Sequence, residues 1–69
     1  MLLKELKGIL KEELSITLSS DNPENHYSDD YVNFEDIEEE RLESEVISID
    51  TWNNVRHANE RSYLITLKW

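Results

Sequence analysis

Three stretches of the chain alternate apolar and polar residues, and this period of two constrains the fold more than any other feature. The stretches are residues 14–19, 45–52 and 62–69. Their inward-facing residues are expected to be Leu14, Ile16 and Leu18, then Ile47 and Ile49, then Tyr63, Ile65, Leu67 and Trp69. We predict three half-buried strands, the last two paired as an antiparallel hairpin across a polar connection at residues 53–61.

A fourth strand is predicted at residues 31–34, with Val32 and Phe34 on one side and Tyr31 on the other. It should pair with the strand at residues 14–19. Residues 20–30 between them form a polar loop, because Asp21-Asn22-Pro23 is a turn signal.

Two helices are predicted. Residues 2–12 place leucines at steps of three and four and lysines on the other face, and Gly8 is a costly interruption. We expect this helix to pack on the sheet, although it could fill a groove on a partner. Residues 35–43 fit one to two helical turns, with Asn33 and Asp36 resembling a capping box. Alternatively, the second strand continues through Ile37 and only residues 38–42 are helical.

These elements predict one α+β domain spanning residues 1–69. Its N-terminal helix packs on a four-stranded antiparallel sheet, and a short acidic helix lies between the second and third strands. The opposite face of the sheet is expected to be partly open, showing Tyr31, Val46, Trp52 and Leu64. A chain of 69 residues buries little surface, so its stability is expected to be marginal.

Charge is concentrated in the central third of the chain. Residues 21–45 hold eleven of the sixteen acidic residues and a single base, Arg41, whereas the formal net charge of the whole chain is −9. Such acidity disfavours direct binding to nucleic acid or anionic membranes and favours basic partners. There is no cysteine, no membrane-length apolar run and no signal-peptide pattern at the start, which fits a cytoplasmic protein.

The residues that catalysis or metal binding would need are missing or poorly spaced. The acids Asp21, Glu24, Asp29 and Asp30 surround His26 but do not match a calcium loop. His57 with Arg56 and Glu60 or Arg61 is better explained as a solvated loop. The single glycine excludes a glycine-rich phosphate loop. We therefore expect neither an enzyme nor a cofactor or metal site.

The order of motifs resembles that of short, mostly uncharacterised phage- and prophage-encoded α+β proteins of Gram-positive bacteria. The residues that carry the resemblance are the opening LLKELKGILKE, the strand SITL, the segment EDIEEERLESEVISI and the final YLITL. These motifs are patterning rather than chemistry. The resemblance implies a compact α+β fold and a mobile-element origin, without an active site.

The charge cluster suggests a function as a small acidic binding protein. It would inhibit or modulate a host protein with a basic, nucleic-acid-binding surface, such as a CRISPR or restriction effector, in the host cytoplasm. The candidate partner-binding residues are Asp29, Asp30, Glu35, Asp36, Glu38, Glu39, Glu40 and Glu43. The alternative is a structural protein that forms a homo-oligomer through its sheet or its exposed last strand.

Overall fold

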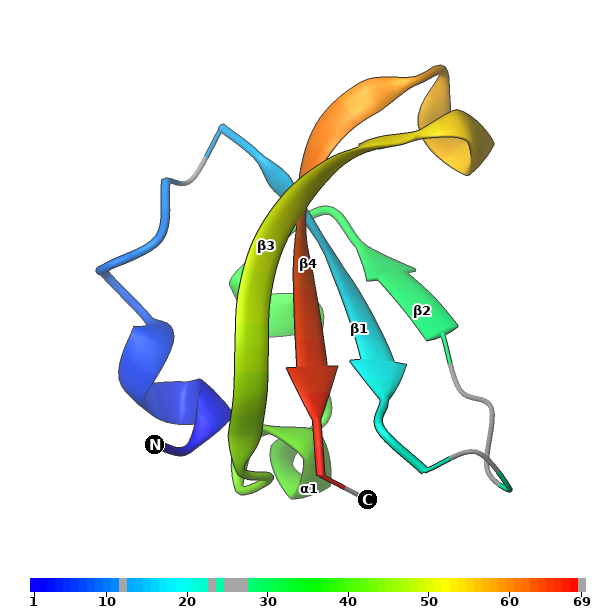
Figure 1. The fold of residues 1–69 in the computed structure, drawn as a ribbon. Coiled ribbons are helices and arrows are strands. Elements are labelled where there is room, and N and C mark those ends of the chain that lie inside the picture. The colour runs from blue at the N-terminus through cyan, green and yellow to red at the C-terminus, as the bar shows by residue number, and fades with distance from the viewer. Residues whose placement is uncertain (12, 23, 25–27, 69) are drawn as a thin grey trace.

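A four-stranded mixed sheet forms the centre of the molecule (Figure 1). The computed structural model describes residues 1–11, 13–22, 24 and 28–68. Its strands are β1 (Ser15–Ser20), β2 (Ser28–Tyr31), β3 (Val46–Asn54) and β4 (Glu60–Leu67), in the spatial order β2-β1-β4-β3. Its helical turns are η1 (Leu3–Leu6), η2 (Phe34–Asp36) and η3 (Val55–His57), all 3₁₀, and α1 (Glu39–Leu42). The predicted α+β class with four strands is confirmed.

The prediction of a wholly antiparallel sheet was wrong, because β1 lies parallel to β4. In this pair Leu18 faces the same side as Ile65, and both side chains are fully buried. β2 and β3 carry acidic side chains and occupy the two edges, where charge is tolerated. The two strands with the most buried residues, β1 and β4, therefore take the centre although they are far apart in sequence, which pairing neighbours along the chain cannot anticipate.

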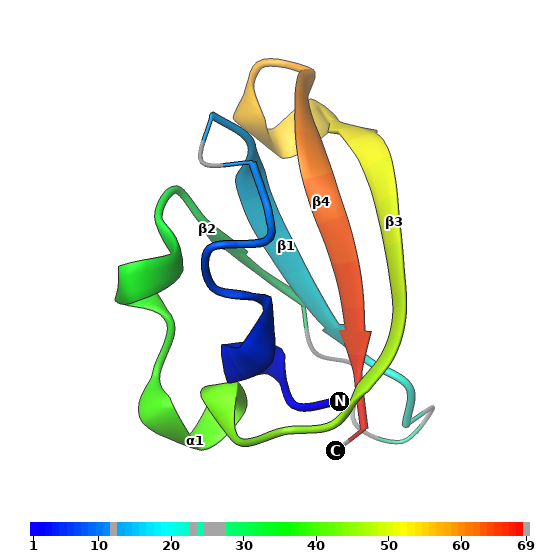
Figure 2. The ribbon, with the colours of Figure 1, turned by 90° about the vertical axis from the view of Figure 1, so that its left-hand side faces the viewer.

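η1, η2 and α1 lie on one side of this sheet, together with the N-terminal segment before β1 (Figure 2). Leu3 and Leu6 of η1 and Ile37, which lies between η2 and α1, are at most 4% exposed and complete the core over β1 and β4. We call this side of the sheet the helical side and the opposite side the open face. Because Ile37 is buried on the helical side, the acidic residues next to it in the chain also lie on this side.

The predicted helix over residues 2–12 was wrong, since only Leu3–Leu6 forms a 3₁₀ turn. Lys7 leaves the helical region and Gly8 has a φ of 83°, a conformation open to glycine but strained for other residues. One turn suffices to bury Leu3 and Leu6, whereas Ile9 remains 68% exposed. The glycine therefore ends the helix rather than interrupting it.

The predicted strand at residues 31–34 was displaced by three residues. β2 spans Ser28–Tyr31, so the predicted loop is shorter, and the pairing buries Tyr31 opposite Ile16 while Val32 is 60% exposed. Displacing a strand by an odd number of residues exchanges its two faces, which explains the inverted burial. The capping box at Asn33 was also wrong, because its side chain makes no capping hydrogen bond.

The short acidic helix between the second and third strands is confirmed as α1. Ile37 before it is extended, with φ −75° and ψ 132°, and separates α1 from η2. The alternative, in which the second strand continues to Ile37, was wrong about the strand, since β2 ends at Tyr31. The single helical turn that this alternative placed at residues 38–42 closely matches α1.

The hairpin of β3 and β4 is confirmed, with a shorter connection than predicted because β3 extends to Asn54. Ile47 and Ile49, expected to be inside, are 51% and 42% exposed, because β3 is an edge strand with an irregular register between Val46 and Ser48. Trp69 lies outside the described residues.

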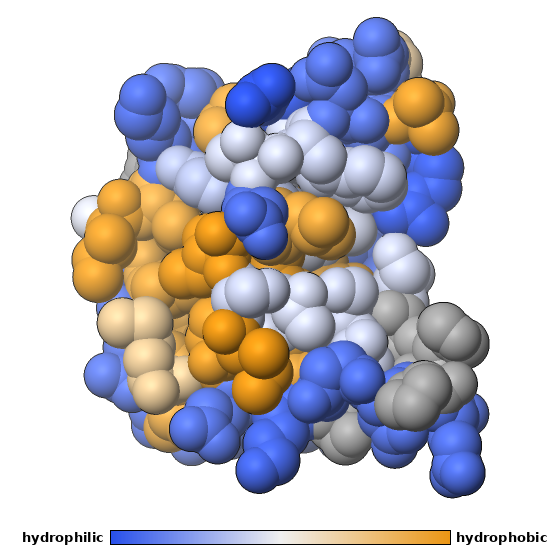
Figure 3. All heavy atoms as spheres, viewed as in Figure 1, coloured by the Kyte–Doolittle hydropathy of each residue, from blue (hydrophilic) through white to orange (hydrophobic). Residues whose placement is uncertain are grey.

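The prediction of the residues on the open face was half right. Val46 pairs with buried Leu67, and Tyr31 with buried Ile16, so both belong to the helical side. The register places Trp52 and Leu64 on the open face as expected. Figure 3, which views this face, shows side chains of intermediate hydropathy at its centre and a hydrophobic area toward β3 and the N-terminal segment.

Candidate functional site

The candidate site is the acidic segment, which we define as residues 35–43. Ile37 is 4% exposed and Leu42 packs against the core, so the chain is held on the helical side at two points. The acidic residues between and beside these anchors are all exposed: Glu35, Asp36, Glu38, Glu39, Glu40 and Glu43. Two apolar anchors thus hold this segment on the core while its carboxylates remain exposed.

Glu38 belongs to a cluster of polar side chains around the Tyr31 hydroxyl. Tyr31 donates a hydrogen bond to Glu38 Oε2 at 2.8 Å, and Arg41 Nη1 donates to both the hydroxyl and Glu38. Arg41 also lies 3.3 Å from Asp29 Oδ2. Arg41, the single base of the acidic stretch, therefore forms its contacts within the molecule and links α1 to β2.

Hydrogen bonding and burial shift the pKa values of Glu38 and Tyr31 in this cluster. The hydrogen bond from Tyr31 lowers the pKa of Glu38 below its ordinary value. Burial of Tyr31, reinforced by its bond to Glu38, raises the pKa of the phenol well above its ordinary value. Both shifts favour one pair of protonation states, an ionised Glu38 and a neutral Tyr31, which is the pattern of a structural contact.

Glu43 is engaged in a second ion pair. Lys4 Nζ lies 2.9 Å from Glu43 Oε1 and 3.2 Å from its other oxygen, and both side chains are more than half exposed. This pair links η1 to the end of α1. Because it is exposed, we expect it to contribute less than about 1 kcal/mol to stability.

Asp30 lies on the open face, away from the acidic segment. It pairs with Thr17 in the sheet and accepts hydrogen bonds from Thr17 Oγ1 at 2.7 Å and Asn54 Nδ2 at 2.8 Å. Arg56 Nε lies 3.2 Å from its second oxygen, and the Arg56 guanidinium stacks 5.6 Å from the centre of the Trp52 ring. Asp30 is therefore the centre of a satisfied polar network.

Trp52 covers this network. Its indole nitrogen donates to Thr17 Oγ1 at 3.3 Å, so the ring reaches from β3 across β4 to β1. Thr17, Asn54 and Ser62 beneath it are at most 1% exposed, and no buried side-chain polar atom of the described residues lacks a hydrogen bond. The indole thus closes a polar layer that the alternating pattern alone did not reveal.

The eight predicted partner-binding residues therefore divide equally. Asp29, Asp30, Glu38 and Glu43 each form an ion pair within the molecule. Within the described residues, the other four form none, and we call them the free acids: Glu35, Asp36, Glu39 and Glu40. The free acids lie on the helical side, on or next to η2 and α1, whereas Asp30 lies on the opposite face.

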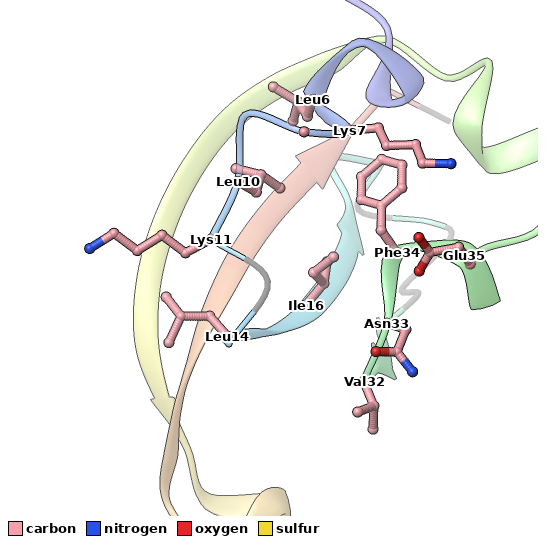
Figure 4. Close-up of a pocket in the computed structure, with 11 residues that line it drawn as sticks. Leu6, Lys7, Leu10, Lys11, Leu14, Ile16, Val32, Asn33, Phe34 and Glu35 are labelled. Carbon is pink, nitrogen blue, oxygen red and sulfur yellow. The ribbon is translucent and has the colours of Figure 1, made fainter.

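A hollow that the sequence did not indicate adjoins the acidic segment. Its volume is about 220 Å³, and it lies between the N-terminal segment and residues 32–35 (Figure 4). Its apolar lining is Leu6, Leu10, Leu14, Ile16, Val32 and Phe34, and its polar lining includes Lys7, Lys11, Asn33 and Glu35. Glu35 therefore belongs both to the free acids and to the rim of the hollow.

The described residues contain no group of three or more metal-binding side chains suited to hold an ion. Of the histidines considered from the sequence, His26 lies outside the described residues, as does the side chain of His57. No helix of the described residues is long and apolar enough to cross a membrane. Arg56, which the sequence grouped with His57 as a possible polar site, instead contacts Asp30.

Comparisons with known proteins add no family assignment. No protein-family model matches the chain, and no curated protein and no solved structure matches it.

Proposed function

We propose that the protein is a non-enzymatic binding protein whose acidic segment docks on a basic surface of another protein and so inhibits or modulates it. The observation that carries this proposal is the set of free acids, which no lysine or arginine among the described residues neutralises. A net charge of −9 accelerates association with a cationic surface.

The partner chemistry that fits this charge is an array of lysine and arginine side chains, as on nucleic-acid-binding proteins. The resemblance of the chain to phage-type proteins supports a host restriction or CRISPR effector as this partner, which the protein would bind in the host cytoplasm. Carboxylates spaced along η2 and α1 would occupy the sites of phosphates on such a protein.

Two variants with the same net charge test whether docking is local. In the first, the free acids become glutamine or asparagine: Glu35→Gln, Asp36→Asn, Glu39→Gln and Glu40→Gln. In the second, four exposed acids outside the segment change: Glu13→Gln, Glu24→Gln, Glu45→Gln and Glu60→Gln. Each set of four changes the formal charge from −9 to −9 + 4 = −5. Used as baits with a cell extract, the second variant should retain the partners of the wild type and the first should lose them.

Equal retention by both variants would contradict the proposal, because global charge would then explain the binding. Glu38 and Glu43 are left unchanged, since their ion pairs with Arg41 and Lys4 would confuse loss of binding with loss of structure.

A second candidate function, self-association through the sheet, is favoured by the outer edge of β3. The last strand, expected to be exposed, is central, so β3 takes that role. Met1 O accepts a hydrogen bond from Val46 N at 2.8 Å and covers only the start of this edge. Ile47 and Ile49 are exposed farther along. A strand of this kind can pair with a second copy.

Salt separates the two candidates. Docking of the free acids on a cationic partner weakens as salt rises from about 50 to 500 mM, because the screening length falls from above 10 Å to a few ångströms. Association of two copies, each at −9, should instead strengthen with salt. Sedimentation should show Ile47→Lys to be monomeric, and Val55→Lys, at a position 76% exposed outside β3, to behave as wild type. A wild type that stays monomeric at high salt and high micromolar concentration would remove this candidate.

A further inference from the structure

The hollow beside the acidic segment has the features of a receptor for a single side chain. Leucine, isoleucine, valine and phenylalanine residues form the larger part of its lining, and its volume of about 220 Å³ exceeds that of the ~150 Å³ apolar cavity known to take benzene. Figure 4 shows Leu6, Leu10 and Phe34 around it, contributed by the N-terminal segment and η2. An aromatic ring or a leucine side chain fits this space.

The two lysines at the hollow contribute chiefly alkyl surface. Lys11 directs its ammonium group away from the hollow, whereas the side chain of Lys7 extends past the Phe34 ring, toward the side on which Glu35 lies (Figure 4). Long lysine side chains commonly cover apolar surface in this way while the charge stays in water. The walls are therefore mostly hydrocarbon, and polar selectivity is left to groups at the rim.

Glu35 is the acidic residue of the lining and lies on the side of the acidic segment. It lines the hollow, forms no ion pair within the described residues, and is followed by Asp36, another free acid. Figure 4 shows its side chain projecting from η2, directly after Phe34 in the chain. A ligand that fills the hollow from this side meets the Glu35 carboxylate beside an apolar site, with the Lys7 ammonium on the same side.

We propose that the hollow accepts one large apolar side chain, aromatic or leucine, from the basic partner, with a lysine or arginine next to it that contacts Glu35. This inference rests on the proposed function and identifies the anchor that the partner supplies. A buried apolar anchor accounts for residence time, whereas the free acids account for attraction at a distance. Acidic docking alone would leave binding weak at physiological salt.

Two synthetic peptides test this division. Both are capped and lysine-rich, and they differ only at the central residue, which is phenylalanine in one and alanine in the other. Titrated into the full chain, the phenylalanine peptide should bind about tenfold more tightly, as expected for burying an aromatic side chain. This ratio should persist at high salt while both affinities fall. A ratio near one would overturn the inference and leave the proposed function standing.

Neighbouring positions provide a matched pair of variants. Leu10→Trp fills the hollow and should bring the ratio close to one, whereas Ile9→Trp adds the same ring at an exposed position outside the lining and should leave it unchanged. If Leu10→Trp does not fold, methyl NMR of the wild type decides. The phenylalanine peptide should shift Leu6, Leu10 and Ile16 strongly and Val55 little. The opposite pattern, or no shift at all, would overturn the inference.

The variant without free acids separates the two proposals. If it binds the alanine peptide as tightly as the wild type while the ratio stays tenfold, the acidic docking fails and the hollow remains a receptor. If it loses affinity for both peptides and keeps the ratio, both proposals are supported.

Discussion

Asp30 and Glu40 carry the same charge and lie ten positions apart, yet their surroundings differ in every respect. Asp30 accepts hydrogen bonds from Thr17, Asn54 and Arg56 beneath the Trp52 ring, whereas Glu40 is exposed and forms no ion pair with any described residue. An ion pair within the molecule likewise separates Asp29, Glu38 and Glu43 from the other free acids. A run of acids in a sequence thus combines structural carboxylates with carboxylates available to a partner.

The sharpest test of this contrast is one alanine substitution in each group. Asp30→Ala removes charge-assisted hydrogen bonds from three donors, and we expect it to lower the free energy of unfolding by about 2–3 kcal/mol. Glu40→Ala should change it by less than about 0.5 kcal/mol. Urea unfolding monitored by circular dichroism measures both. Similar values for the two variants would break the distinction.

Tyr31→Phe tests the structural role of the second cluster. The substitution leaves the buried ring in place but removes the hydroxyl that donates to Glu38 and accepts from Arg41. We expect a loss of about 1 kcal/mol in the free energy of unfolding near neutral pH. A gain in stability would show that Arg41 and Glu38 do not depend on the hydroxyl.

The same variant should change how stability depends on pH. The lowered pKa of Glu38 stabilises the folded state above the ordinary value of 4.5, and this is lost as the pH falls through the folded pKa. The raised pKa of Tyr31 stabilises the folded state at pH values below 10.0, the ordinary pKa of tyrosine. This stabilisation is lost as the pH rises from 10.0 toward the pKa that Tyr31 has in the folded state. The difference between wild type and Tyr31→Phe should be largest between these limits and shrink on both sides. A difference independent of pH would contradict this assignment.

The smallest expected effect concerns the stability of the variant without free acids. Its net charge of −5 reduces self-repulsion, so at low salt it should be slightly more stable than the wild type, by less than about 1 kcal/mol. The difference should vanish at high salt. Thermal unfolding at two salt concentrations measures it, and a clear loss of stability would show that the free acids have structural partners.

Local patterns in the sequence predicted the hairpin of β3 and β4, the short acidic helix and the four strands. Ile65 and Leu67 were correctly placed inside because strand alternation depends only on neighbouring residues. The parallel pairing of β1 with β4 could not be predicted in this way, since it depends on which strands bury most apolar surface together.

The site was predicted in composition but not in arrangement. Arg41, as the only base in the acidic stretch, was a usable signal that some of the carboxylates would be paired. Nothing local indicated that Asp30 would face Asn54 and Arg56, because these contacts join β2 to the end of β3, at the opposite edge of the sheet, and to η3 after it. The hollow likewise requires the chain to turn at Gly8, whose effect depends on a φ that leucine spacing does not reveal.

The most direct test of the central claim is the salt dependence of binding for the two variants of equal charge, measured by calorimetry with a lysine-rich peptide. The variant that keeps the free acids should retain the steep salt dependence of the wild type, and the variant that lacks them should bind weakly with a shallow one. Identical curves for the two would show that the carboxylates at residues 35, 36, 39 and 40 are not a docking surface.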